Sequence, residues 1–226
     1  MCFFVVNRVD FLRPVGIEVC PMRNILLVLL IGFALSLCNL SGRFKKDAST
    51  SGSSATNSAS EGPVERGQPT AEQTAALAGG QQAKWERQGI SWTVPPNWTE
   101  QENESKSFMW RSPGGSDAAN LIVSISPMDE NFPTDLQPWY DQAKSRAKNG
   151  EVDEVKWVEI DGLKGVQFRE ANPEKPDDSR RLQWMAYRKY TGQVQLINLM
   201  LATQGKSFDR HKNAMYGILY STKVVH

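Results

Sequence analysis

The most regular pattern of apolar and polar positions lies between Arg181 and Gln204. Two apolar, strand-like runs flank Thr191-Gly192, where a glycine can supply the positive φ that a tight hairpin needs. The second run places apolar side chains on both faces: Val194, Leu196 and Met200 on one, and Ile197, Leu199 and Leu201 on the other. Because a strand that is apolar on both faces is covered on both, the pattern predicts a central hairpin between two layers.

The other strand-like segments complete a mainly antiparallel sheet. Strands are expected over residues 85–94, 107–111, 120–126, 152–160 and 165–170, the last two joined by the hairpin signal Asp161-Gly162. With the central hairpin they make about six to seven strands. The fold class predicted is α+β, an α/β/α sandwich with helices on both faces of the sheet.

Two helices are predicted. The first begins with Thr134 or Asp135 as its cap and runs to Lys148, where Asn149-Gly150 supplies a stop. Its apolar stripe, expected to face the sheet, consists of Leu136, Trp139, Tyr140, Ala143 and Ala147. The second helix is capped by Ser207 and ends near Thr222. Its expected buried side consists of Phe208, Met215, Ile218 and Leu219.

The composition changes sharply upstream of residue 84. Residues 39–83 are rich in Ser, Gly, Ala, Thr and Gln and hold almost no large apolar side chains. Such a segment buries too little surface to offset its ordering entropy. It is therefore predicted to be a disordered linker that tethers one folded domain, residues 84–226.

The N-terminal part has the character of an export signal. Residues 22–38 open with Met22-Arg23 and continue into an apolar run without charge, shorter than the roughly 18–20 residues of a membrane span. Residues 1–21 mix charged and apolar positions without a clean period. They are interpreted as a doubtful N-terminal extension, with Met22 as the true start.

The end of the apolar run, Leu35-Ser36-Leu37-Cys38, resembles a bacterial lipoprotein cleavage box, in which the cysteine carries lipid. Leu37 departs from the small residue usual before that cysteine. A retained membrane anchor, or cleavage after Ser36 followed by secretion, are the alternatives. The expected location is extracytoplasmic and membrane-anchored in the cell envelope, with attachment through Cys38, or alternatively secreted.

Composition narrows the chemistry further. The formal net charge is +1, which gives no global field for nucleic acid, and no nucleic-acid partner is predicted. All three cysteines precede residue 39, so residues 84–226 hold no thiol nucleophile or disulfide. The seven tryptophans all lie in the predicted domain, where they are interpreted as core residues, the alternative being an aromatic-lined ligand groove.

No group of residues has the spacing of a catalytic or metal site. His211 lacks an orienting carboxylate and a nucleophile at a suitable spacing. The pairs Asp129-Glu130 and Asp177-Asp178 lack the several oxygens and turn glycine of a calcium loop. The cations Arg169, Arg180, Arg181, Arg188 and Lys189 alternate between strand faces and are expected to form ordinary ion pairs. No catalytic residue, metal or cofactor is predicted.

Three short motifs in this element order resemble the PsbP-like α/β/α sandwich superfamily. They are Val94-Pro95-Pro96-Asn97-Trp98, the hairpin that begins at Asp161-Gly162, and the closing Ile218-Leu219-Tyr220-Ser221. The superfamily includes the photosystem II subunit PsbP, a Ran-binding nuclear transport factor and bacterial DcrB-like lipoproteins. Over residues 85–224 the resemblance implies the fold and an accessory binding role, often exported and tethered, and it assigns no functional residue.

The resulting expectation is an exported, membrane-tethered, non-catalytic module that binds a protein or a small molecule. Trp98 and Arg188 are predicted to be exposed binding residues. The alternative is an unrecognised hydrolase acting on envelope material, which would need polar groups with shifted pKa values converging in one pocket.

Overall fold

The computed structural model describes residues 62–225. The predicted N-terminal extension (1–21), the signal or anchor (22–38) with Cys38, and residues 39–61 of the predicted linker lie outside this range.

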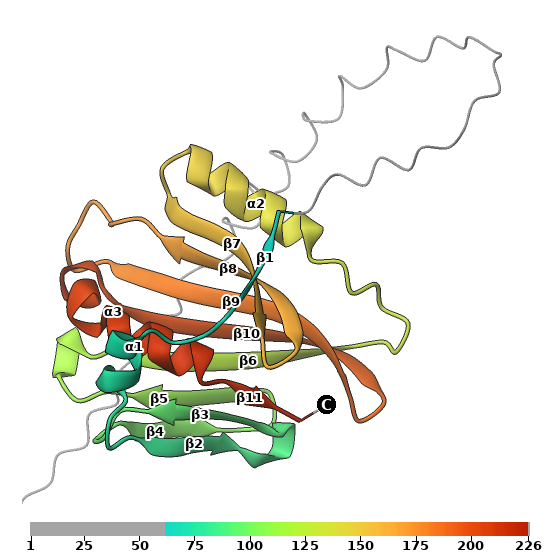
Figure 1. Cartoon of the computed structure of the whole chain (residues 1–226), viewed down its shortest axis with the longest axis horizontal. Helices are drawn as coiled ribbons and strands as arrows, with labels where there is room; N and C mark the ends of the chain where they lie inside the picture. Colours follow the sequence, from blue (N-terminus) through green and yellow to red (C-terminus); the bar gives the residue numbers. More distant parts are fainter. Residues whose placement is uncertain (1–61, 226) are drawn as a thin grey trace, which may run out of the picture. The chain divides into compact units, whose positions relative to one another are not determined.

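An eight-stranded sheet forms the centre of the described chain (Figure 1). In spatial order its strands are β1 (Val64–Arg66), β7 (Val152–Ile160), β8 (Leu163–Glu170), β9 (Ser179–Tyr190), β10 (Gln193–Gln204), β6 (Asn120–Met128), β5 (Ser107–Arg111) and β4 (Thr99–Asn103). All neighbours are antiparallel except β1 and β7. A smaller sheet has the order β11 (Lys223–Val224), β3 (Ile90–Val94) and β2 (Gln81–Trp85). The helices are α1 (Ala71–Ala76), α2 (Gln137–Lys148) and α3 (Gly205–Tyr220), with short 3-10 turns at Glu86–Gln88 and Gly115–Asp117.

The predicted α+β class and the central hairpin are confirmed. Strands β9 and β10 pair in the middle of the large sheet, and the turn between them has φ of 50° at Thr191 and 77° at Gly192. The β7–β8 turn likewise has positive φ, at Asp161 and Gly162. Two consecutive positive φ values are the mark of the turn whose twist suits a two-residue hairpin.

The structure has more strands than predicted. The expected strand over 85–94 contains only the last residue of β2, then the 3-10 turn and the whole of β3, so that β2 lies mostly upstream of it. Strand β4 has the sequence TEQEN and lies exposed at the sheet edge, so it has no apolar alternation to predict it. Strand β11 has only two residues.

One face of the large sheet is covered by α3 and the smaller sheet (Figure 1). Ile197, Leu199 and Leu201 of β10 lie fully buried in this layer. Aromatic rings fill the space between the sheets: the ring of Phe108 stacks on Trp92 at 5.2 Å and on Trp85 at 5.6 Å between centroids. Six of the seven tryptophans are buried in the described structure, which supports their interpretation as core residues.

The opposite face is covered only in part. Helix α2 packs on β7 and β8, where the rings of Tyr140 and Trp157 stack with centroids 4.9 Å apart. Beyond β9, the side chains of Met200 on β10, Ile122 on β6 and Met109 on β5 are cross-strand neighbours and only half-buried. The prediction of two covering layers therefore holds fully for one face and only for part of the other.

The helix boundaries correct several predictions. Helix α2 has Leu136 as its N-cap, and Asp135 Oδ1 accepts a hydrogen bond of 2.8 Å from the Gln137 backbone nitrogen. Trp139 is 39% exposed and does not lie on the buried stripe. Helix α3 starts two residues before Ser207, which is buried within the helix rather than capping it. The predicted buried side of α3 is confirmed.

The folded unit starts earlier than Lys84, so the predicted linker boundary is wrong for residues 62–83. This segment forms β1, α1 and most of β2, and we call residues 64–80 the N-terminal strap. Glu65 on β1 forms an ion pair of 2.9 Å with Lys156 of β7. Helix α1 approaches α3 closely at Gly217, where only a glycine fits, because a Cβ there would lie 2.7 Å from the Gln73 carbonyl oxygen. Composition does not reveal this order, because the strap is held by backbone pairing and by contact with the domain surface, and no side chain of α1 is buried.

We predict that the strap contributes to stability. A chain that starts at Gln81 loses β1 and α1 but keeps β2 whole, and its melting temperature should fall by roughly 5–15 °C relative to a chain that starts at Gly62, about 2–4 °C for each kcal/mol. Thermal unfolding followed by circular dichroism measures the difference. As a matched control without deletion, Gly217→Val should lower the melting temperature of the longer chain. Equal melting temperatures for the two chains would show that the strap adds nothing.

Candidate functional site

A groove of about 380 Å³ lies beside α2, on the partly covered face of the large sheet. Its wall consists of Trp139, Gln142, Ala143 and Arg146. These positions are spaced three and four residues apart and so share one side of the helix. Trp139 is the large exposed side chain of this wall.

The floor of the groove comes from β8, β9, β10 and β6 and mixes polar with apolar side chains. The apolar floor residues are Phe168, Met185 and Leu196, and the polar ones include Ser124, Ser126, Gln183 and Asn198. Gln183 Nε2 donates a 2.6 Å hydrogen bond to Asn198 Oδ1 across the β9–β10 pair. The amides therefore orient each other, while the serine hydroxyls of β6 stand beside them.

The two arginines that line the groove form ion pairs with glutamates at its end. The Nε of Arg181 donates to Glu170 Oε2 at 2.8 Å, and Arg146 Nη2 lies 3.3 Å from Glu170 Oε1. The hydrogen bond to Glu170 raises the pKa of Arg181 above its usual range. Arg146 also pairs with Glu151 at 3.1 Å. Two cations face two carboxylates, so this end of the groove carries no net charge.

A second polar cluster, between α3 and strands β7–β9, has the residue types of an active site. Tyr216 Oη donates to Glu154 Oε2 at 2.8 Å, and Arg169 Nη1 donates to Tyr216 Oη at 2.9 Å. Asp153 accepts from Arg169 and from Arg180, each at 2.6 Å. Burial raises the pKa of Tyr216 well above its usual value, so its hydroxyl stays protonated at neutral pH.

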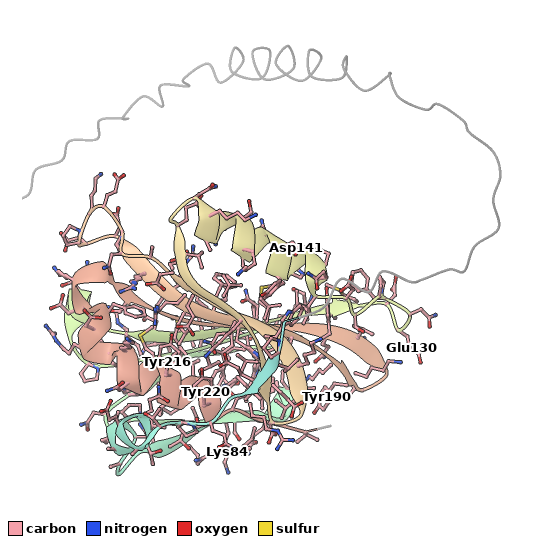
Figure 2. The ribbon with its side chains drawn as sticks, turned by 45° about the horizontal axis from the view of Figure 1, so that its top comes forward. Lys84, Glu130, Asp141, Tyr190, Tyr216 and Tyr220 are labelled. Carbon is pink, nitrogen blue, oxygen red and sulfur yellow. The ribbon has the colours of Figure 1, made fainter. Side chains whose placement is uncertain are left out.

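The members of this cluster bind one another. Tyr216 and its neighbour Tyr220 lie on consecutive turns of α3 (Figure 2), and Tyr220 Oη donates to Gln167 at 3.0 Å. Gln167 in turn donates to Glu154 Oε1 at 2.7 Å. Because each of these groups already has a protein partner, the cluster is a hydrogen-bond network that holds α3 on the sheet.

The two predicted binding residues are not exposed. Trp98 is 4% exposed and belongs to the hydrophobic core, while its backbone oxygen accepts a 2.6 Å bond from Gln81. Arg188 is also 4% exposed. The expectation of exposure was wrong for both, because the side chain of Trp98 packs into the core after the turn at Pro96-Asn97 and Arg188 points to the covered face of β9.

The other candidates lie apart from the groove. His211 on α3 is half-buried, with Nε2 2.9 Å from the Asp117 backbone oxygen. The pairs Asp129-Glu130 and Asp177-Asp178 are exposed. Within residues 62–225, no group of three or more His, Cys, Asp or Glu side chains is placed to hold a metal ion. No helix in this range is long and apolar enough to cross a bilayer.

Sequence reasoning missed the groove. One available signal was the polar side chains of Ser124, Gln183 and Asn198 within otherwise apolar strands. Polar residues on one face of a strand indicate that no helix covers that part of the face.

The comparisons with known proteins place the chain beside several solved structures. No family model matches the sequence, and no curated protein matches it. LpqN of Mycobacterium tuberculosis, described as involved in cell envelope biogenesis, has a TM-score of 0.47 at 14% identity, over 61% of this chain and 83% of that one. Cyanobacterial PsbP from Synechocystis sp. PCC 6803 has a TM-score of 0.43 at 18% identity, over 65% of this chain and 92% of that one. The Ran-binding protein Mog1p of Saccharomyces cerevisiae has a TM-score of 0.36 at 12% identity, over 65% and 95%.

One of these structures is itself a PsbP protein. At such identities and TM-scores the likeness carries no argument about the family or the function of this chain.

Proposed function

We propose that this chain is an exported, membrane-tethered, non-catalytic module that binds a protein partner through the groove beside α2. The observation that carries the proposal is Trp139, a large aromatic side chain held 39% exposed at the edge of a sheet face that α2 leaves partly open. Exposed aromatic side chains beside open apolar surface are typical anchors of interfaces.

The surface extends beyond the groove, which favours a protein over a small molecule. Met200, Ile122 and Met109 continue the same face across β10, β6 and β5 as half-buried cross-strand neighbours. A small ligand would need only the groove, whereas this row offers an apolar strip to a broader partner. Methionine side chains adapt to a partner surface because their unbranched chains repack easily.

The chemistry of the groove indicates which kind of partner segment fits. Arg146 and Arg181 are already neutralised by carboxylates, so a charged segment would gain little. The exposed ring of Trp139 and the floor residues Met185 and Leu196 suit an apolar side chain. Ser124 and Ser126 offer hydroxyls to backbone or amide groups. The proposed partner segment is therefore uncharged, with an apolar anchor and hydrogen-bonding groups.

An envelope hydrolase is the weaker alternative. A general acid or base must reach a substrate with a free proton-transfer group. The groups with this chemistry, Glu154 and Tyr216, spend their hydrogen bonds on each other and on Arg169. His211 contacts a backbone oxygen. No cofactor and no nucleic acid enters the proposal.

Site-specific photocrosslinking tests the binding surface. A photoreactive amino acid at Met200 or Gln142, in the full chain expressed in its native host, should form a defined adduct with one envelope protein. The same residue placed at Asn213, exposed on α3, is the matched control and should not form it. Adding Trp139→Ala should reduce the adduct by about tenfold, the effect of one interface anchor of 1–2 kcal/mol. Equal adducts from both faces, or an adduct that Trp139→Ala leaves unchanged, would contradict the proposed surface.

The proposed tether rests on Cys38, and it has its own test. Cys38→Ala should move the chain from the membrane fraction to the soluble or unprocessed pool and remove the mass of the lipid. Ser41→Ala, three residues beyond Cys38, is the control and should change neither. Unchanged fractionation and mass in the Cys38 variant would instead favour a retained apolar anchor.

A further inference from the structure

Arg188 is a buried cation without a carboxylate partner in the described structure. Its Nε donates to Gln195 Oε1 at 2.9 Å and its Nη2 to Gln88 Oε1 at 3.1 Å. Its Nη1 is buried without a hydrogen-bond partner among residues 62–225. The guanidinium carbon lies 4.1 Å from the centroid of the Tyr190 ring. Two neutral amides and one aromatic ring therefore surround a full positive charge.

This arrangement is energetically unfavourable for a purely structural residue. Burying a charge without a counter-charge is strongly unfavourable, because the ion loses its hydration and gains no compensating attraction. Arg180 shows the usual solution in the same strand, because Asp153 lies 2.6 Å from its Nη2. Burial lowers the pKa of Arg188 to about 10, so the side chain keeps its charge at neutral pH.

Two of the residues that contact the Arg188 guanidinium, Gln88 and Tyr190, are themselves half-exposed. Gln88 belongs to the 3-10 turn Glu86–Gln88 and is half-exposed, and its Nε2 donates to the Ser105 backbone oxygen at 2.7 Å. Tyr190 is half-exposed at the end of β9, near the periphery of the domain (Figure 2). A rotation of the Gln88 side chain would free Nη2 for another acceptor.

We propose that Arg188 is the recognition centre of a carboxylate-binding site, which Gln88 covers in the free protein. The Nη1–Nη2 edge presents two parallel N–H donors, the geometry that a carboxylate accepts with both oxygens. A carboxylate also matches the site in charge, since one anion meets one cation. A phosphate would bring about two negative charges at neutral pH into a site with a single cation.

This site is independent of the groove beside α2, because Arg188 lies on the opposite face of β9 from Gln183 and Met185. The carboxylate belongs either to a small organic acid or to an acidic side chain of a polypeptide. Both sources offer the same planar anion, and the experiment separates them.

The test uses the purified full chain and sodium acetate, with sodium chloride added to hold the ionic strength constant. Acetate should raise the melting temperature along a saturable curve. Arg188→Gln should weaken the response at least tenfold. Arg87→Gln, which removes an exposed charge from the same turn, is the matched control and should leave the response unchanged. Inorganic phosphate should bind more weakly than acetate.

Gln88→Ala keeps the proposal falsifiable if Arg188→Gln does not fold. This variant should bind acetate more strongly, because Arg188 Nη2 no longer has to break its hydrogen bond to the Gln88 amide. A capped Gly-Glu-Gly peptide then identifies the source: binding of the peptide at the same site indicates a polypeptide carboxylate, and binding of acetate alone indicates a small acid. No saturable response to acetate in the wild type and in Gln88→Ala, or an equal response in Arg188→Gln, would overturn the proposal.

Discussion

The pairing of β9 with β10 is the constraint on which the rest of the structure depends. Each strand has 12 residues, and the pair lies at the centre of the eight-stranded sheet with apolar side chains on both faces. Both faces then need cover. On one side α3 and the smaller sheet provide it completely, around a core of stacked aromatic rings. On the other side α2 packs mainly on β7 and β8, so the faces of β10, β6 and β5 stay half-open. The groove is the boundary between the covered and open parts of one sheet face.

Most charged side chains in the described structure pair with one another and stabilise the fold, whereas Arg188 does not. Between α3 and the sheet, Glu154, Arg169 and Tyr216 hydrogen-bond to one another. This network holds the helix on the sheet and leaves none of the three side chains available for proton transfer. In the groove the cations are likewise paired, which leaves shape, amides and hydroxyls to select a partner. Arg188 departs from both patterns, since its buried Nη1 has no hydrogen-bond partner within residues 62–225 and so has capacity left for an external anion.

Sequence reasoning was accurate where a residue pattern reports directly on local geometry. The two hairpin turns and the buried side of α3 follow from turn chemistry and from apolar periodicity. It failed where tertiary contacts decide. The N-terminal strap has the composition of a linker and is ordered by pairing with β7 and by docking on α3. Trp139 shares the apolar spacing of α2 but lies beyond the strands that the helix covers, and Arg188 points under the 3-10 turn rather than to solvent. Neither position is encoded in a local period.

The central claim is that the two faces of β10 differ, one being core and the other a surface available to a partner. Leu199 is fully buried and Met200, the next residue, is half-buried on the opposite face. The most direct test is the free energy of unfolding of Leu199→Lys and Met200→Lys, measured by urea denaturation. We expect Leu199→Lys to lose several kcal/mol, enough to unfold a domain of about 5–15 kcal/mol in total, and Met200→Lys to lose less than about 1 kcal/mol. A comparable loss in both variants would contradict the account, because it would show that the Met200 face is also part of the core.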